Sequence, residues 1–247
     1  MPAARLLRSD LVHPTRGSHA LLGPTDLRER ALAYAVGMPQ ERAFSHLTAA
    51  ALHGLPLPRR LEASAREGEL HVIAPTSDGR VEREGCVGHR GLERRHTELV
   101  DGVRVTSLVE TWCDFGELRR GTLTIADLVT LGDAVVARLD SRAPADLQPH
   151  AGDRSSPGMA ELQATLLRRV RPRGKCALTY ALTLMRPRVR SAMESRARLM
   201  FAMAGFPEPE VNAPVVDHAG EWLGEGDLVW RQERVVGEYQ GSHHADI

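Results

Sequence analysis

The chain contains 247 residues, of which 42% are apolar and 26% are charged, and its 32 basic and 32 acidic side chains give a formal net charge of zero. This composition is typical of a globular protein with one large domain or two ordinary ones. It excludes a membrane protein, because no segment approaches the ~18 consecutive apolar residues that a span needs. The N-terminus also lacks the apolar core of a signal peptide, so we expect a cytoplasmic protein.

Residues 1–139 are predicted to form a mixed α and β domain. Hydrophobic periodicity and turn residues predict, in chain order, helices over 26–36 and 45–53, strands over 70–75, 85–90 and 102–107, and helices over 107–115 and 124–139. Thr124 is a typical N-cap residue for the last helix, and His46 and His53 are expected to cap or pack the second one. Residues 140–156 are rich in Asp, Pro, Ser and Gly, which predicts a linker.

Residues 157–247 are predicted to contain three helices followed by three strands, so the fold class is α+β or α/β. The helices are expected over 157–170, 174–185 and 191–205, and the strands over 211–216, 222–230 and 234–240. Start signals support two of the helices, because Ser156 is followed by Pro157 and Ser191 is a favourable N-cap residue.

The charges are segregated along the second half of the chain. Residues 154–200 carry 11 basic and two acidic side chains, whereas residues 205–247 carry two arginines and nine acids. Such blocks suit a protein that holds phosphate with one surface and a cation with another. The alternative is that they are two solvated helix faces and an acidic loop.

The last two predicted strands place two acids in register. If residues 231–234 form a four-residue hairpin loop, residue 230 lies opposite 235, and Asp227 lies opposite Glu238 with Cβ atoms about 4.5 to 5.5 Å apart. Facing carboxylates are destabilising unless they share a proton or bind a cation. Oxygen ligands of this kind suit Mg²⁺, and Gln240 on the same strand face could orient a water or touch a phosphate oxygen.

These residues also match a family pattern. The segments SAMESRARLMFAMAGFPEPEVNAPVVD, GDLVW and RVVGEYQGSHH together resemble the restriction-endonuclease-like, or PD-(D/E)XK, nucleases, and within them the very-short-patch-repair endonucleases. The resemblance implies that Glu194 is a supporting helix acid, that Asp227 and Glu238 bind Mg²⁺ or Mn²⁺, and that Tyr239 offers its backbone carbonyl to the metal. Gln240 would be the polar third member of the motif, where many active members carry lysine.

The resemblance extends to the end of the chain. A histidine after the third strand recurs in this branch of the family, so His243 or His244 is a candidate acid or base, with an ordinary surface role as the alternative. The family core continues past that strand with a helix and another strand, for which the seven residues after Gln240 are too few. We therefore expect a core that lacks its final helix and strand, in a chain that is truncated at both ends.

The three acidic positions have simpler explanations. Glu194 stands three residues after Ser191, so the pair also matches a capping box. Asp227 and Glu238 could instead be exposed hairpin acids that pair with the loop arginines, Arg231 and Arg234.

The first half of the chain resembles a different family. The order DLVHPTRGSHAL, AFSHLTAAALHGLPLP, LHVIAPTSDGR and VDGVRVTSLVETWCDFG is similar to the AbiEi-type antitoxins of toxin–antitoxin systems. Members usually begin with a winged helix-turn-helix that binds DNA, and here DLVHPTRGSHA resembles only its wing. The resemblance implies DNA as a partner, a cognate toxin as a second one, and an incomplete winged-helix start.

The two resemblances together imply a metal-dependent endonuclease that acts on DNA, in DNA repair or phage defence. In this hypothesis the DNA backbone is contacted by basic residues of the 168–198 region, namely Arg168, Arg169, Arg171, Arg173, Lys175 and Arg196. Two alternatives stay open. One is a non-catalytic, antitoxin-like transcriptional regulator with a degenerate nuclease fold, and the other is an interaction module with no role on DNA.

Overall fold

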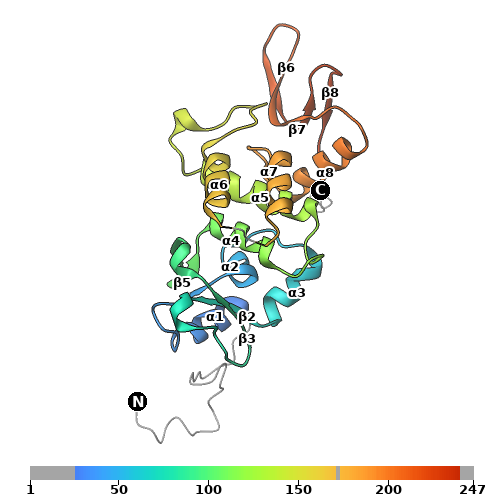
Figure 1. The fold of residues 1–247 in the computed structure, drawn as a ribbon. Helices are drawn as coiled ribbons and strands as arrows, with labels where there is room; N and C mark the ends of the chain where they lie inside the picture. Colours follow the sequence, from blue (N-terminus) through green and yellow to red (C-terminus); the bar gives the residue numbers. More distant parts are fainter. Residues whose placement is uncertain (1–25, 171–172, 240–247) are drawn as a thin grey trace, which may run out of the picture. The chain divides into compact units, whose positions relative to one another are not determined.

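The computed structural model describes residues 26–170 and 173–239. The chain divides into two compact units, Met1–Leu118 and Arg119–Ile247, here called the N-terminal and the C-terminal unit (Figure 1). Over the described residues there are eight α-helices, a mixed five-stranded sheet and an antiparallel three-stranded sheet, which confirms the predicted α+β class. None of the described helices is long and apolar enough to cross a membrane.

The N-terminal unit is built around the five-stranded sheet, with the strand order β3-β2-β1-β5-β4. Strands β2 and β3 are parallel, as are β1 and β5, whereas β1–β2 and β4–β5 are antiparallel. The elements are α1 (Leu27–Ala35), β1 (Ala43–Phe44), α2 (His46–Leu52), α3 (Arg59–Glu67), β2 (Leu70–Ala74), β3 (Cys86–Arg90), β4 (Thr97–Val100), β5 (Val103–Thr106) and α4 (Leu108–Asp114).

Buried side chains of the central strands form the core of this unit. Phe44, Val72 and Val105 are fully buried and pack together with Tyr34 of α1. Asp26 caps the start of helix α1, because its carboxylate accepts a hydrogen bond from the Glu29 N–H at 2.8 Å. The sequence did not predict α3, β1 or β4, because β1 and β4 have only two and four residues and α3 contains just three apolar residues among nine.

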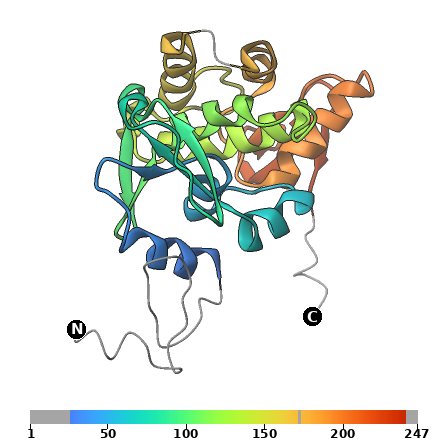
Figure 2. The same cartoon turned by 60° about the horizontal axis from the view of Figure 1, so that its bottom comes forward.

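The C-terminal unit joins four helices to the three-stranded sheet, with the strand order β6-β7-β8. Its elements are α5 (Ile125–Asp140), α6 (Pro157–Arg168), α7 (Lys175–Leu184), α8 (Ala192–Met203), β6 (Glu210–Val216), β7 (Trp222–Trp230) and β8 (Val235–Gly237). Helices α6 and α7 lie side by side on α5 (Figure 2). Helix α5 opens with a complete capping box between Thr124 and Asp127.

The boundary between the units differs from the linker expected over 140–156. Helix α5 packs against α6, α7 and α8, so it is counted with the C-terminal unit although it precedes those residues. The linker residues do connect α5 to α6, and they contain one turn of 3-10 helix over Ala145–Leu147. Periodicity identifies a helix but does not reveal which partners cover its apolar face, so the difference is one of tertiary packing.

Candidate functional site

The β7–β8 hairpin has the register expected from the sequence. Trp230 pairs with Val235 and Val229 pairs with Val236, so a four-residue loop joins the two strands. The same register places Asp227 opposite Glu238, one residue beyond the end of β8. The ladder was expected to continue to residue 240. After Gly237, however, the Tyr239 N–H donates to the Asp227 carboxylate at 2.8 Å.

The two carboxyl groups influence each other. Partial burial raises the pKa of Glu238, and the negative charge of Asp227 raises it further. Asp227 is half-buried and Glu238 is exposed, so the pair opens to solvent. An accessible pair of mutually repelling carboxylates can share a proton or take up a cation.

Glu194 is buried at the start of α8 and has a structural role. Its own N–H donates to the Ser191 hydroxyl at 3.2 Å, so Ser191 caps the helix. Its carboxylate accepts from the Arg190 N–H at 2.9 Å and from the Asn212 side-chain amide at 2.7 Å. The capping alternative therefore holds in part, and the same carboxylate also bonds to strand β6.

Asn212 connects Glu194 to the acidic pair. Pairs on either side of it, Val211 with Leu228 and Ala213 with Gly226, place Asn212 beside Asp227 across β6 and β7. Its backbone has a φ of 46°, a conformation that asparagine tolerates better than most residues. Glu194, Asn212, Asp227 and Glu238 thus form a row of polar residues from α8 across the three strands, here called the acidic row.

A buried ion-pair network fixes α8 against α5. The Arg198 guanidinium lies 3.2 Å from Asp133 and 3.2 Å from Glu208, and both Arg198 and Asp133 are buried. Asp133 also accepts from the Ser195 hydroxyl at 2.8 Å and from the Arg186 N–H at 2.9 Å. Burial raises the pKa of Asp133 to about 6, although the charge of Arg198 and these hydrogen bonds oppose the rise. The network holds the helix that carries Glu194.

The segregated charges of the sequence pair with one another in space. Arg186 and Arg198 both bind Glu208, and Arg188 and Arg190 both bind Glu225. The expected cation-binding and phosphate-binding blocks thus neutralise each other in part. Five of the six basic residues predicted to contact DNA are described, and they lie in two places.

The predicted DNA contacts gather mainly at the α6–α7 turn. Arg168 and Arg173 are exposed there, while Arg169 and Lys175 are half-buried. Arg196 lies apart on α8, exposed and 3.8 Å from Asp127. The remaining predicted residues, Arg171, Gln240, His243 and His244, lie outside the described residues.

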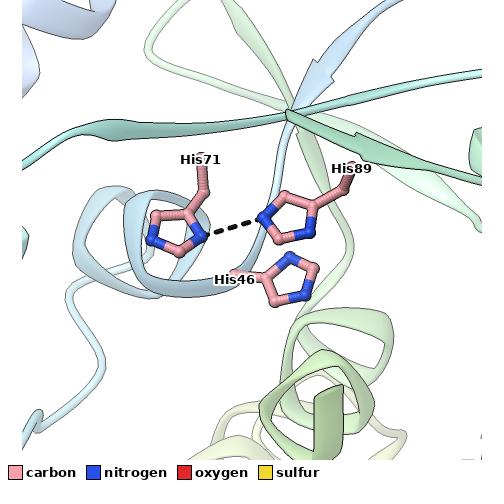
Figure 3. Close-up of side chains that lie close together, drawn as sticks. All are labelled: His46, His71 and His89. Carbon is pink, nitrogen blue, oxygen red and sulfur yellow. Dashed lines mark hydrogen bonds between the residues drawn. The ribbon is translucent and has the colours of Figure 1, made fainter. Parts of the chain in front are cut away.

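A second group of chemically capable side chains comes together only in the folded protein. His46, His71 and His89 come from α2, β2 and β3 and lie together in the N-terminal unit (Figure 3). The His46 and His89 rings stack with centroids 3.6 Å apart, and His71 Nδ1 lies 3.0 Å from His89 Nε2. Burial lowers the pKa of His46 well below its ordinary value and that of His71 and His89 to about 4.

The prediction that His46 and His53 cap or pack agrees with the full burial of His46 and the 4% exposure of the His53 side chain. His53 Nε2 lies 2.8 Å from the Thr106 carbonyl oxygen. The only sign of this histidine group in the sequence was that two predicted strands, 70–75 and 85–90, each contain a histidine, His71 and His89. Their proximity depends on a parallel pairing that the sequence does not reveal.

Comparisons with known proteins give little further information. The chain is 38% identical over 68 residues to the uncharacterised protein Rv2248 of Mycobacterium tuberculosis strain H37Rv, and equally to the uncharacterised protein MT2308 of strain CDC 1551. Each match covers 28% of this chain and 25% of the relative, so the chain matches only a quarter of the length of these relatives. No family model matches the chain, and no solved structure matches it significantly.

Proposed function

We propose that the C-terminal unit is a metal-dependent endonuclease of the restriction-endonuclease-like class and hydrolyses phosphodiester bonds in DNA. The observation that carries this proposal is the acidic row, in which Asp227 lies opposite Glu238 and Glu194 reaches the same row through Asn212. Asp227, Glu238 and Glu194 are the acids that the resemblance implies. The β7–β8 register was expected from loop length alone, which makes it an independent argument.

The donor set fits a hard divalent cation. Asp227 and Glu238 are accessible carboxylates. Partial burial raises the pKa of Glu238 and the negative charge of Asp227 raises it further, and a cation would neutralise this repulsion. These two side chains would hold Mg²⁺ or Mn²⁺, together with the Tyr239 carbonyl that the resemblance implies. Such an ion, when bound, polarises a phosphate oxygen and lowers the pKa of a water ligand.

The neighbouring residues would position this pair. Asn212 donates to Glu194 and lies beside Asp227, so it limits the movement of β6 relative to α8. The Tyr239 N–H would orient one Asp227 oxygen, which leaves the other available. Gln240 would position water or phosphate, and His243 or His244 would move a proton, as the resemblance implies.

The α6–α7 turn is the part of the basic block that best suits a DNA backbone. Four basic side chains gather there, of which Arg168 and Arg173 are exposed and Arg169 and Lys175 are half-buried. Four phosphate contacts predict that the logarithm of the binding constant falls with the logarithm of the salt concentration with a slope of about −3 to −4. Binding through the backbone would carry little sequence information.

A plasmid assay tests catalysis. Wild-type protein is expected to nick or linearise supercoiled DNA with Mg²⁺ or Mn²⁺, and Glu238→Gln is expected to lower the rate by about 100-fold or more. The matched control is Glu233→Gln, an exposed acid in the loop of the same hairpin. Glu238→Gln should also raise the melting temperature slightly, because it removes a repulsion, so lost cleavage would not reflect unfolding.

Two outcomes would reject the proposal. If the wild type shifts DNA in a gel but cuts it with neither metal, the protein is the non-catalytic, antitoxin-like regulator, with a cognate toxin as the partner to seek. If it shows no salt-dependent DNA binding either, the roles on DNA are wrong and an interaction module is left.

A further inference from the structure

The N-terminal unit contains a group of imidazoles that the proposed nuclease chemistry does not use. We propose that His46, His71 and His89 form a binding site for a divalent transition metal, with Zn²⁺ as the best-matched ion. One ring nitrogen of each residue lies within 4.8 Å of one nitrogen of each of the others (Figure 3).

The fold brings the three residues together from separate segments. In the parallel β2–β3 pair, His89 lies opposite Ile73, which stands two residues after His71 in β2. Side chains two residues apart share a strand face, so His71 and His89 project from the same side of the sheet. His46 is the first residue of α2 and directly follows Ser45, whose N–H donates to the His71 carbonyl at 3.0 Å.

His46 is held in an unfavourable state. Its backbone φ is 50°, a left-handed conformation that costs a non-glycine residue free energy and is found mostly where the surrounding structure or a function enforces it. The side chain is fully buried, and its Nε2 atom makes no hydrogen bond. Buried polar atoms are normally satisfied, and the nearby Glu117 carboxylate, 3.9 Å from Nε2, is too far for a hydrogen bond, so this nitrogen is an independent sign of a ligand-binding role.

The distances suit a tetrahedral ion. Bonds of about 2.0 to 2.1 Å from Zn²⁺ to imidazole place ligand nitrogens about 3.3 Å apart. His71 Nδ1 and His89 Nε2 are 3.0 Å apart, so a small rotation of either ring would admit the ion in place of the proton they now share. The His46 ring, stacked on His89, would turn to direct its nitrogen to the same point.

The surroundings support nitrogen ligation by a transition metal. The three rings are buried or half-buried, and neutral imidazole is the form that binds metals. Imidazole suits Zn²⁺, Cu²⁺ and Ni²⁺ and not the hard Mg²⁺ of the nuclease proposal. A buried carboxylate, Asp114, lies 3.9 Å from His46 Nδ1 and is held by Arg95 Nε at 2.9 Å, so it can act as the outer partner of a ligating histidine.

Cobalt spectroscopy on the full chain tests the site. Metal-free wild type titrated with Co²⁺ is expected to develop the intense visible absorption of a four-coordinate ion, to saturate at one ion per chain, and to lose the signal when Zn²⁺ is added. The weak absorption of six-coordinate Co²⁺ marks an ion on scattered surface histidines. This measurement needs no variant, so a folding defect does not affect it.

Variants then assign the ligands. His89→Gln is expected to abolish the intense band and to weaken Zn²⁺ binding by more than about 10-fold. Loss of a residue that only hydrogen-bonds to a metal ligand already weakens binding by about that factor, so loss of a ligand should weaken it more. The control is His96→Gln, an exposed histidine of the same unit, which should bind as the wild type does. Circular dichroism checks that both variants are folded.

Three results would overturn the proposal. They are a wild type that shows only six-coordinate absorption, a folded His89→Gln variant that keeps the intense band, and a His96→Gln variant that loses it. In each case the histidines would be a stack of neutral rings with a packing role. None of these outcomes bears on plasmid cleavage, which depends on the acidic row in the other unit.

Discussion

The buried arginine of α8 provides the sharpest stability prediction. Arg198→Met removes the guanidinium while keeping much of the side-chain volume, and leaves Asp133 in the interior without its cation. At 3.2 Å and an effective dielectric constant of about 20, the attraction between two unit charges is about 5 kcal/mol. Loss of one partner of a buried pair costs about 3 to 5 kcal/mol, so we expect a loss of that size at pH 7.5.

The loss should depend on pH. Burial raises the pKa of Asp133 from its ordinary 3.8 to about 6 in the folded protein, so between these values the folded state binds more protons than the unfolded state. The stability contributed by this group therefore falls as the pH rises through about 6. At pH 5 Asp133 is largely protonated, and removal of Arg198 leaves no unpaired charge. We expect the destabilisation to be smaller at pH 5 than at pH 7.5.

Urea unfolding measures both effects. The fluorescence of Trp230, buried against Phe201 with ring centroids 5.1 Å apart, reports on the C-terminal unit, and a Trp112→Phe background removes the signal of the N-terminal one. The control is Arg196→Met on the same helix, because this arginine is 42% exposed and its pair should contribute at most about 1 kcal/mol. Equal losses for the two variants, or a loss for Arg198→Met that does not change with pH, would refute the reasoning.

Two further predictions concern backbone positions near the two sites. Gly88→Ala should destabilise the N-terminal unit by about 1 to 3 kcal/mol in thermal unfolding, because the added Cβ would lie 2.1 Å from the Val81 carbonyl oxygen. The control is Gly37→Ala, which should change the stability little because the added Cβ has open space around it. Equal losses of stability for the two variants would contradict this prediction. Asn212→Ala should cost about 2 to 3 kcal/mol, because buried Glu194 loses a charge-assisted hydrogen bond. Asn212→Gly tolerates the left-handed backbone but also lacks the amide, so a glycine variant as stable as the wild type would show that the backbone conformation matters more than the bond.

Much of the C-terminal sheet could be predicted from local information. The pairing of Trp230 with Val235 follows from a four-residue loop, and in a strand of period two that single pairing sets the partner of every other residue, including Asp227 and Glu238. Helix starts at Thr124, Ser156 and Ser191 were also predictable, because their hydroxyls accept hydrogen bonds from backbone N–H groups three residues on. These are short-range effects that the sequence contains directly.

Charge pairing was beyond the reach of the sequence. The basic block looked like a phosphate-binding surface because it is almost free of acids along the chain. In the folded protein, residues 205–230 lie against the basic block, so that Glu208 and Glu225 form ion pairs with its arginines. Arg198, two residues from an exposed arginine of the same helix, is buried only because α8 turns that side toward Asp133. Residue type alone does not distinguish the two.

The sequence by itself determined that Asp227 faces Glu238 and that Ser191 caps the helix of Glu194, because a hairpin register and a helix cap depend on neighbours along the chain. It did not identify Asn212, the fourth residue of the acidic row, whose bond to Glu194 is a tertiary contact. Only the tertiary structure decided that His46, His71 and His89 meet, because their proximity requires β2 and β3 to pair in parallel and α2 to start beside them. A parallel pair of strands needs a connection that returns the chain to the same end of the sheet, and no local sequence pattern specifies which strands will then pair. The acidic pair was therefore visible in the sequence, while the imidazole group appears only in the folded N-terminal unit.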